Sequence, residues 1–170
     1  DSYFEIFGKQ FGVKTIAYSY KTKFHNANSK RELTEKEFLE GCEIVELANQ
    51  TLQKFKYKHI LKLLARNWFQ VKNADQIFAV GLIKKRIDEL EYVKGGTGWT
   101  IQMAIDHRKK IFVFDQNQMQ WFSWDYSTKK FVLCIDEPKI SVQNFAGIGT
   151  RKINLFGIQA IENLYINSFK

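Results

Sequence analysis

The sequence predicts an α/β domain with a mainly parallel β-sheet, because segments with helical spacing of apolar residues alternate with short apolar runs. Two of these runs, residues 76–80 and 111–114, have the length and composition of buried strands. Glycine-rich turns precede two of the predicted helices, at residues 95–98 and 147–149. With 170 residues the chain can bury one core of ordinary size, so we predict a single domain over residues 1–170.

The composition is that of a globular protein with no membrane segment. Hydrophobic residues make up 45% of the chain and charged residues 26%, and no apolar run is long enough to cross a bilayer. Cys42 and Cys134 lie far apart in apolar surroundings. This placement predicts small core residues in a reducing, cytoplasmic compartment rather than metal ligands. We therefore expect no metal and no cofactor.

The net charge of +8 has two interpretations. It suits an anionic partner, either a nucleotide or a nucleic acid, and it also results from a lysine-rich composition without such a partner. Residues 54–59 alternate basic with aromatic side chains, a pattern that can stack bases while lysines contact phosphates. The same pattern is typical of a solvated edge whose aromatic side chains pack inward. Nucleic-acid binding stays an alternative, carried by Lys54, Lys56, Lys58, Lys62 and Tyr57.

A short helix and a strand begin the chain. Asp1 and Ser2 can cap a helix over residues 3–7, which ends near Gly12. Residues 13–20 favour β-structure and predict a strand.

A longer helix follows a polar loop at residues 21–30. Thr34 and Glu37 have the spacing of a capping box, in which each side chain bonds the other residue's backbone N–H. The apolar stripe of this helix consists of Phe38, Cys42, Val45, Ala48 and Leu52.

The middle of the chain predicts two helix–strand pairs separated by a charged surface excursion. The expected elements are a helix at 60–71, a strand at 75–81, a hairpin at 84–91, a helix from the turn at 95–98, and a strand at 110–115.

The last third predicts a hairpin, a strand and a final helix. Apolar runs at 121–124 and 130–134 flank a polar turn, which predicts a small β-hairpin near residues 120–135. Pro138 precedes an expected short strand at 140–142. A second glycine turn at 147–151 opens a helix with the apolar residues Ile158, Ile161, Leu164 and Tyr165.

Several of these turns fall where α/β sheets bind ligands, at the carboxyl ends of parallel strands. The residues concerned are Gly81, the turn from Gly95 to Gly98 with Asp115 and Gln116, and the turn from Gly147 to Arg151. A glycine-rich turn before a helix leaves backbone N–H groups unpaired at the positive end of the helix dipole, which suits phosphate. The alternative is a tight turn into a packed helix.

The motif Gly95-Gly96-Thr97-Gly98, with a helix and a Val113-Phe114-Asp115 strand end after it, resembles the SLOG superfamily. That group joins the DNA-processing protein A fold with the Lonely-guy phosphoribohydrolases. Residues 65–75 and 77–81 are similar to its Arg-Asn helix and following strand. Residues 95–106, 112–116 and 145–151 also resemble an uncharacterised bacterial and phage branch of small SLOG-like proteins.

The resemblance implies a Rossmann-like three-layer domain and a nucleotide or nucleotide-derived ligand. By position, Gly95, Gly96, Thr97 and Gly98 would cradle phosphate, and Arg66 would neutralise it. The predicted ligand-binding residues are Arg66, Asn67, Gly81, Gly95, Gly96, Thr97, Gly98, Asp115, Gln116, Gly147, Gly149, Thr150 and Arg151.

Several of these residues have a structural alternative. Arg66 could pair with a carboxylate or a helix end, and Asn67 could hold the loop after the strand. Asp115 could hold its own turn. Thr150 and Arg151 could be a cap and a surface charge at the last helix.

The chain departs from the family's phosphoribohydrolases at the positions of their paired glutamates, which here are Ile101 and Gln102. An amide does not titrate at neutral pH, so it cannot serve as a general base. Cleavage of an N-glycosidic bond would therefore rest on Asp115 or Asp106. Our first hypothesis is instead a module that senses or sequesters the ligand, for example in a phage–host conflict.

The family's relatives usually begin with a strand and a glycine turn ahead of the helix matched by residues 1–12. The expected first strand is missing here. An upstream segment or another chain would complete the sheet, and we expect a homo-oligomer or such a partner.

Overall fold

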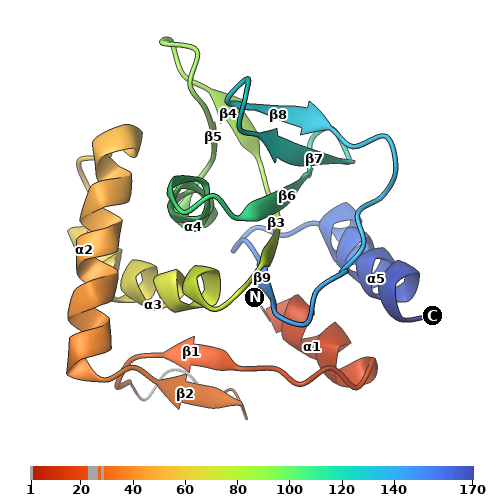
Figure 1. Cartoon of the computed structure of the whole chain (residues 1–170), viewed down its shortest axis with the longest axis horizontal. Coiled ribbons are helices and arrows are strands. Elements are labelled where there is room, and N and C mark those ends of the chain that lie inside the picture. The colour runs from red at the N-terminus through yellow and green to blue at the C-terminus, as the bar shows by residue number, and fades with distance from the viewer. Residues whose placement is uncertain (1, 23–26, 28) are drawn as a thin grey trace.

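A five-stranded sheet forms the centre of the computed structural model, which describes residues 2–22, 27 and 29–170. Its strand order is β8-β7-β6-β3-β9 (Figure 1). The strands are β3 (Gln76–Gly81), β6 (Lys110–Asp115), β7 (Gln120–Asp125), β8 (Lys130–Leu133) and β9 (Phe145–Ile148). β3 pairs in parallel with both β6 and β9, whereas β7 is antiparallel to β6 and to β8. Only β7 therefore runs against the other four, which confirms the mainly parallel sheet.

Helices cover both faces of this sheet and give a layered α/β architecture (Figure 1). One face carries α2 (Glu35–Leu52), α3 (Leu61–Lys72) and α4 (Gly96–Asp106), and the other carries α1 (Ser2–Gln10) and α5 (Leu155–Phe169). The central strand β3 is buried on both sides. Ile77 packs into the core under α3 and α4, whereas Phe78 packs into the core under α1 and α5. An apolar run without polar alternation is what such a strand requires.

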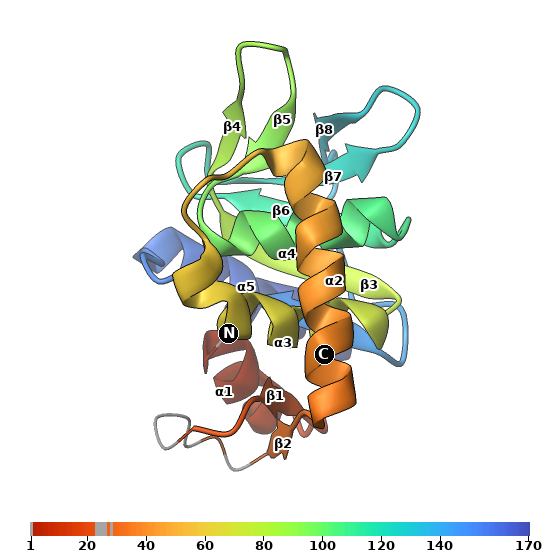
Figure 2. The ribbon, with the colours of Figure 1, turned by 90° about the vertical axis from the view of Figure 1, so that its left-hand side faces the viewer.

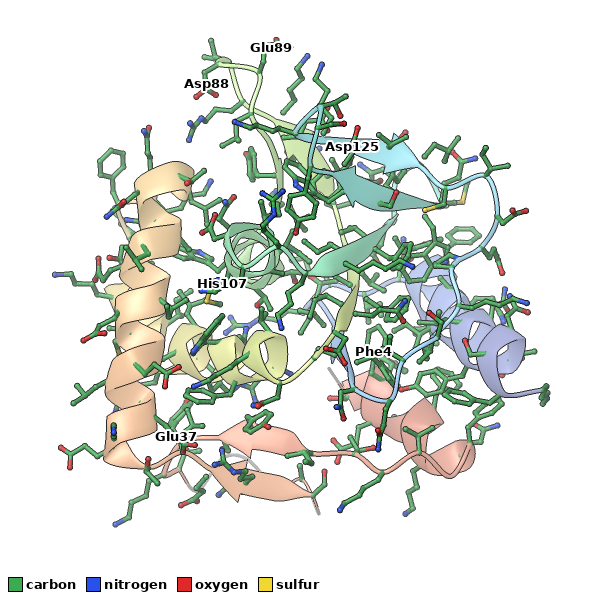
Figure 3. The ribbon with its side chains drawn as sticks, viewed as in Figure 1. Phe4, Glu37, Asp88, Glu89, His107 and Asp125 are labelled. Carbon is green, nitrogen blue, oxygen red and sulfur yellow. The ribbon has the colours of Figure 1, made fainter. Side chains whose placement is uncertain are left out.

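The capping box at Thr34 is confirmed. The Thr34 hydroxyl accepts a hydrogen bond of 3.2 Å from the Glu37 N–H, and the Glu37 carboxylate accepts one of 2.9 Å from the Thr34 N–H. This fixes the start of α2, where Figure 3 labels Glu37. The predicted helices at 3–7 and 60–71 are also present, as α1 and α3.

Two small sheets and a short 3₁₀ turn complete the described elements. β1 (Ala17–Ser19) pairs in parallel with β2 (Lys30–Glu32), and β4 (Ile83–Lys85) forms a hairpin with β5 (Glu91–Val93). The 3₁₀ turn η1 (Lys58–Ile60) leads into α3. Figure 2 shows the β4–β5 hairpin at one end of the molecule and β1–β2 at the other. The expected excursion at 84–91 is therefore the β4–β5 hairpin.

The hairpin near residues 120–135 is β7–β8, and tryptophans anchor it to both faces of the sheet. Trp121 packs edge-on to Phe114, with ring centroids 5.5 Å apart. Trp124 packs edge-on to Phe131 at 4.9 Å. Both indoles are at least nine-tenths buried, so these aromatic residues bind the hairpin to the core.

Two strand predictions were wrong in extent or place. The strand expected at 13–20 is limited to β1 and belongs to the small sheet with β2. No strand forms at 140–142, where the Gln76 side-chain oxygen accepts from the Ser141 N–H and its amide nitrogen donates to the Ser141 hydroxyl. The expected loop at 21–30 includes residues 23–26 and 28, which lie outside the described part of the chain.

The turn expected at 147–151 is also corrected, because Gly147 lies inside strand β9. A Cβ atom at this position would come within 2.1 Å of the Phe4 ring of α1, so the strand needs glycine for close packing. Figure 3 labels Phe4 where α1 meets the sheet. The cap of α5 is Asn154, whose side-chain oxygen accepts a hydrogen bond of 2.9 Å from the Gly157 N–H.

Across the described residues, no helix is both long and apolar enough to cross a membrane.

Candidate functional site

A cavity of about 1290 Å³ lies beside β9 and extends to the turns that follow the parallel strands. Segments from α1, β1, α3, the start of α4 and the loop after β9 contribute to its wall. Most of the predicted ligand-binding residues line this single cavity. They are Arg66, Asn67, Gly95, Gly96, Thr97, Gln116, Gly147, Gly149, Thr150 and Arg151.

The turn at Gly95 presents open backbone to the cavity. Gly95 has a φ of +79°, in the left-handed region that favours glycine. A Cβ atom built at Gly95 or at Gly96 would meet nothing within 4 Å. Gly96 is the first residue of α4, so backbone donors and the positive end of the helix dipole lie beside this open space.

Thr97 fastens this turn to the loop after β9. Its hydroxyl donates a hydrogen bond of 2.9 Å to the carbonyl oxygen of Gly149. Thr97 is 6% exposed, so the bond is shielded from water. The two glycine-containing segments therefore form one continuous wall of the cavity.

Gln116 supports the same loop from the end of β6. Its side-chain amide donates to the Lys152 carbonyl at 3.2 Å and accepts from the Asn154 N–H at 2.7 Å. Gln116 thus holds the segment that carries Arg151 in place. This role can be read only from the structure, because the partners lie far along the chain.

Arg66 extends from α3 toward β1. Its Nη1 atom donates a hydrogen bond of 3.1 Å to the Tyr18 carbonyl oxygen. Burial lowers the pKa of the guanidinium, yet an arginine keeps its charge at neutral pH. Arg66 therefore brings a positive charge to the cavity wall.

Asn67 presents an acceptor that lacks a partner among the described residues. Its Nδ2 atom donates to the Thr100 hydroxyl at 2.9 Å and joins α3 to α4. Its Oδ1 atom is buried, and no described group bonds to it. Buried polar atoms are rarely left in this state, so Oδ1 is an unsatisfied acceptor at the contact of α3 with α4.

Positive charge predominates on the cavity wall. The basic lining residues, apart from His59, are Lys14, Arg66, Lys94, Arg151 and Lys152. Glu5 is the one acidic residue among the described residues of the wall, and its carboxylate accepts from the Ser29 hydroxyl at 3.1 Å. This imbalance favours an anion.

Gly81 and Gly98 lie outside the cavity wall and serve packing. A Cβ atom at Gly98 would come within 1.8 Å of the Val93 carbonyl oxygen, and one at Gly81 within 2.7 Å of the Val93 side chain. Both glycines therefore permit the close approach of β3, β5 and α4.

Asp115 also lies outside the wall. Its Oδ2 atom accepts from the Ile83 N–H at 2.6 Å, and its Oδ1 atom accepts from the N–H groups of Asn117 and Gln118. The carboxylate thus holds the turns that leave β3 and β6, which was the alternative expected for this residue.

Asp106 lies at the opposite end of α4 from the glycine turn. It accepts a hydrogen bond of 2.8 Å from the Gln102 side chain, and burial raises the pKa of its carboxyl. Neither Asp106 nor Asp115 lines the cavity. The two carboxylates on which an N-glycosidase reaction would rest are therefore both absent from its wall.

Some aromatic side chains of the basic and aromatic run at 54–59 are buried in the core, and others are exposed at the surface. Tyr57 is buried against Trp99, with ring centroids 4.7 Å apart, and its hydroxyl donates to Glu46. Phe55 is 96% exposed, and the Lys54 ammonium lies 4.4 Å from the centre of the Tyr92 ring. The tyrosine needed for base stacking thus packs inward.

Three basic residues of the wall are not among the predicted site residues: Lys14, Lys94 and Lys152. Lys94 and Lys152 adjoin Gly95 and Arg151, so their position next to predicted site residues was a usable signal. Lys14 has no such neighbour in sequence and reaches the cavity only through the path of the chain into β1.

Within the described residues, no group of three or more His, Cys, Asp or Glu side chains could hold a metal ion. Comparison with protein-family models, with curated proteins and with solved structures gave no match to this chain.

Proposed function

We propose that the cavity binds a phosphate-bearing nucleotide or nucleotide-derived ligand, and that the protein senses or sequesters it. The observation that carries this proposal is the open turn at Gly95 and Gly96, which faces a cavity whose charged lining residues are predominantly basic. Backbone N–H groups at a helix start bind phosphate oxygens, and arginine or lysine side chains neutralise their charge. We further propose that the α/β/α arrangement is Rossmann-like and of the SLOG type.

The parts of the wall have complementary roles in this proposal. The start of α4 takes a phosphate, and Arg151 and Lys94 supply charge beside it. Small-molecule sites occupy roughly 300–1,000 Å³, so the cavity has room for a nucleotide.

The positions of the carboxylates favour a protein that binds the ligand without cleaving it. A general acid or base must come within hydrogen-bond reach of the reacting atoms. Asp106 and Asp115 are absent from the wall, and Glu5 contacts Ser29 on the α1 side of the cavity. The proposed function therefore requires no catalytic residue.

The test is thermal unfolding in the presence of a mononucleotide, NAD, ADP-ribose or a cyclic dinucleotide. A ligand that binds only the folded state raises the melting temperature by mass action. We expect one ligand class to raise it most for the natural chain, less for Gly96→Ala, whose Cβ atom enters the space proposed for the phosphate, and not at all for Gly96→Asp. Aspartate at the start of a helix is favourable to the helix, so its carboxylate opposes only the bound phosphate.

The proposal fails if none of these ligands raises the melting temperature, or if Gly96→Asp responds like Gly96→Ala. Chromatography of the ligand after incubation separates binding from cleavage. Release of a free base would show that the protein is an N-glycosidase and not a sensor.

A further inference from the structure

The first turn of α5 presents two large apolar side chains to solvent. Leu155 is 81% exposed and Phe156 is 57% exposed, and we call this pair the apolar tip. Asn154 caps the helix here, and the Gln116 side-chain oxygen accepts a hydrogen bond of 2.7 Å from the Asn154 N–H. In Figure 2 the loop that leads into α5, drawn in blue, projects from the left edge of the molecule. The apolar tip therefore has a fixed place at the surface.

A third exposed apolar side chain lies in the neighbouring turn. Met119, between β6 and β7, is 52% exposed. This turn begins at Gln116, whose side chain bonds to the Lys152 carbonyl and to the Asn154 N–H in the loop before α5. These bonds hold the turn beside the start of α5, so exposed apolar surface continues beyond the apolar tip.

The charged residues closest to the apolar tip in sequence are basic. Arg151 and Lys152 precede it, and both are exposed. No aspartate or glutamate occurs in residues 138–161 or in residues 116–124. The N-terminal end of α5 adds a positive partial charge, and no acidic residue occupies its first turn. The surface is therefore apolar at its centre and positive at its border.

A second copy of the chain is a poor complement to this surface. A two-fold contact brings the same patch of both copies together, so Arg151 and Lys152 would meet their own equivalents. The surrounding segments hold no carboxylate to pair with them, and like charges in an interface are unfavourable. A bilayer with anionic lipids offers both complements at once, because its headgroups attract basic residues and its acyl chains accept apolar ones.

We propose that the start of α5 docks on a lipid surface with anionic headgroups, and that Leu155 and Phe156 insert among the acyl chains. Arg151 and Lys152 contact the headgroups. Two apolar side chains with a small basic border give weak, reversible binding. The apolar tip lies outside the cavity wall, so this inference does not rest on the proposed function.

The test is flotation of the protein with vesicles. One set contains phosphatidylserine and phosphatidylcholine, and the other contains phosphatidylcholine alone. We expect the natural chain to float with the anionic vesicles only, and this binding to weaken as the salt concentration rises.

Two matched variants separate insertion from attraction by net charge. Phe156→Asp and Leu39→Asp change the net charge equally, and both positions are 57% exposed. We expect Phe156→Asp to lower the partition coefficient for anionic vesicles by roughly tenfold or more, and Leu39→Asp by at most about twofold. Leu155→Asp should repeat the loss. Aspartate is favourable in the first turn of a helix, so both α5 variants should fold.

A tryptophan at the apolar tip reports insertion directly. The four natural tryptophans are at most 9% exposed, so their fluorescence is shielded from lipid. We expect brominated acyl chains in the anionic vesicles to quench the added tryptophan of Phe156→Trp. The added tryptophan of Leu39→Trp, on α2, should not be quenched.

Three results would overturn the inference. One is equal partition coefficients for Phe156→Asp and Leu39→Asp, because net charge alone would then explain the binding. Another is a natural chain that floats with neither kind of vesicle. The third is a natural chain that sediments as a dimer while Phe156→Asp is a monomer, because a second copy would then cover the apolar tip.

Discussion

The hydroxyl of Thr97 donates a hydrogen bond of 2.9 Å to the carbonyl oxygen of Gly149. This bond joins the start of α4 to the loop after β9, two segments that lie far apart in sequence. The bond fixes the open turn at Gly95 relative to the loop that carries Arg151, so neither segment sets this arrangement alone. In the function that we propose, binding of an anion between them would depend on this contact.

Loss of the Thr97 hydroxyl should weaken both folding and binding. Thr97→Val removes the donor to Gly149, and we expect the free energy of unfolding to fall by about 1 kcal/mol. Urea denaturation measures this change. Thr97→Ser keeps the hydroxyl and serves as the control. An unchanged urea midpoint for Thr97→Val would show that the bond contributes nothing.

Replacement by alanine should destabilise the protein at Gly98 but have little effect on its stability at Gly96, although both glycines adjoin Thr97. Gly98→Ala places a Cβ atom 1.8 Å from the Val93 carbonyl oxygen, so the backbone must move. We expect a loss of about 2 kcal/mol or more in stability. Gly96→Ala meets nothing within 4 Å, and we expect a change of at most about 0.5 kcal/mol. Paired thermal melts of the two variants test this contrast, and equal melting temperatures would contradict it.

Asp106 should make folding less favourable as the pH rises. Burial raises the pKa of its carboxyl above the unfolded value of 3.8, so the folded state prefers the protonated form. Its stabilising contribution is present below pH 3.8 and is lost as the pH rises through the folded pKa. Asp106→Asn should therefore be more stable than the natural chain at pH 7.

The stability difference between Asp106→Asn and the natural chain should shrink as the pH falls toward 3.8. Urea midpoints measured across this range give the comparison. A difference that is constant with pH would show that the carboxyl is not perturbed by its surroundings.

Charge reversal at Arg151 should weaken ligand binding without unfolding the protein. Arg151 is exposed and lines the cavity, so Arg151→Glu should change stability by at most about 0.5 kcal/mol. We expect the ligand affinity to fall and to lose part of its dependence on salt. Lys139→Glu changes the net charge equally at an exposed position outside the wall. Calorimetry measures both affinities. Equal ligand affinities in the two variants would show that Arg151 does not contribute to the site.

Local signals were sufficient for much of the fold. The Thr34 capping box fixes α2 through neighbouring residues, and the apolar run of β3 identifies a strand covered on both faces. The role of Gly147 could not be predicted in this way, because the Phe4 ring that leaves no room for a Cβ atom there comes from the other end of the chain. The contact of the Gln76 side chain with Ser141 likewise joins residues that lie far apart in sequence.

The candidate site was predictable in position but not in the role of each residue. β3 and β9 run in parallel, so their carboxyl ends lie at the same edge of the sheet. The β4–β5 hairpin returns the chain to the end of β3, where the Lys94 N–H donates to the Leu82 carbonyl, and this is why Gly95 and Thr150 meet at one cavity. The sequence alone does not distinguish the roles of the two glycines: Gly96 borders open space, whereas Gly98 packs on Val93. That difference depends on where β5 lies, and β5 is held by its pairing with β4.

The place of β3 in the sheet has a consequence for how the chain is made. β3 is an inner strand of the sheet, and its two neighbours, β6 and β9, both come later in the sequence, with β9 the last strand of the chain. During synthesis, the backbone edge of β3 that β9 covers stays unpaired until Ile148 has left the ribosome. A product that stops short of this point would carry an exposed, apolar strand edge. Such fragments should aggregate or be degraded. The first part of the chain therefore needs the last third to reach a stable folded state.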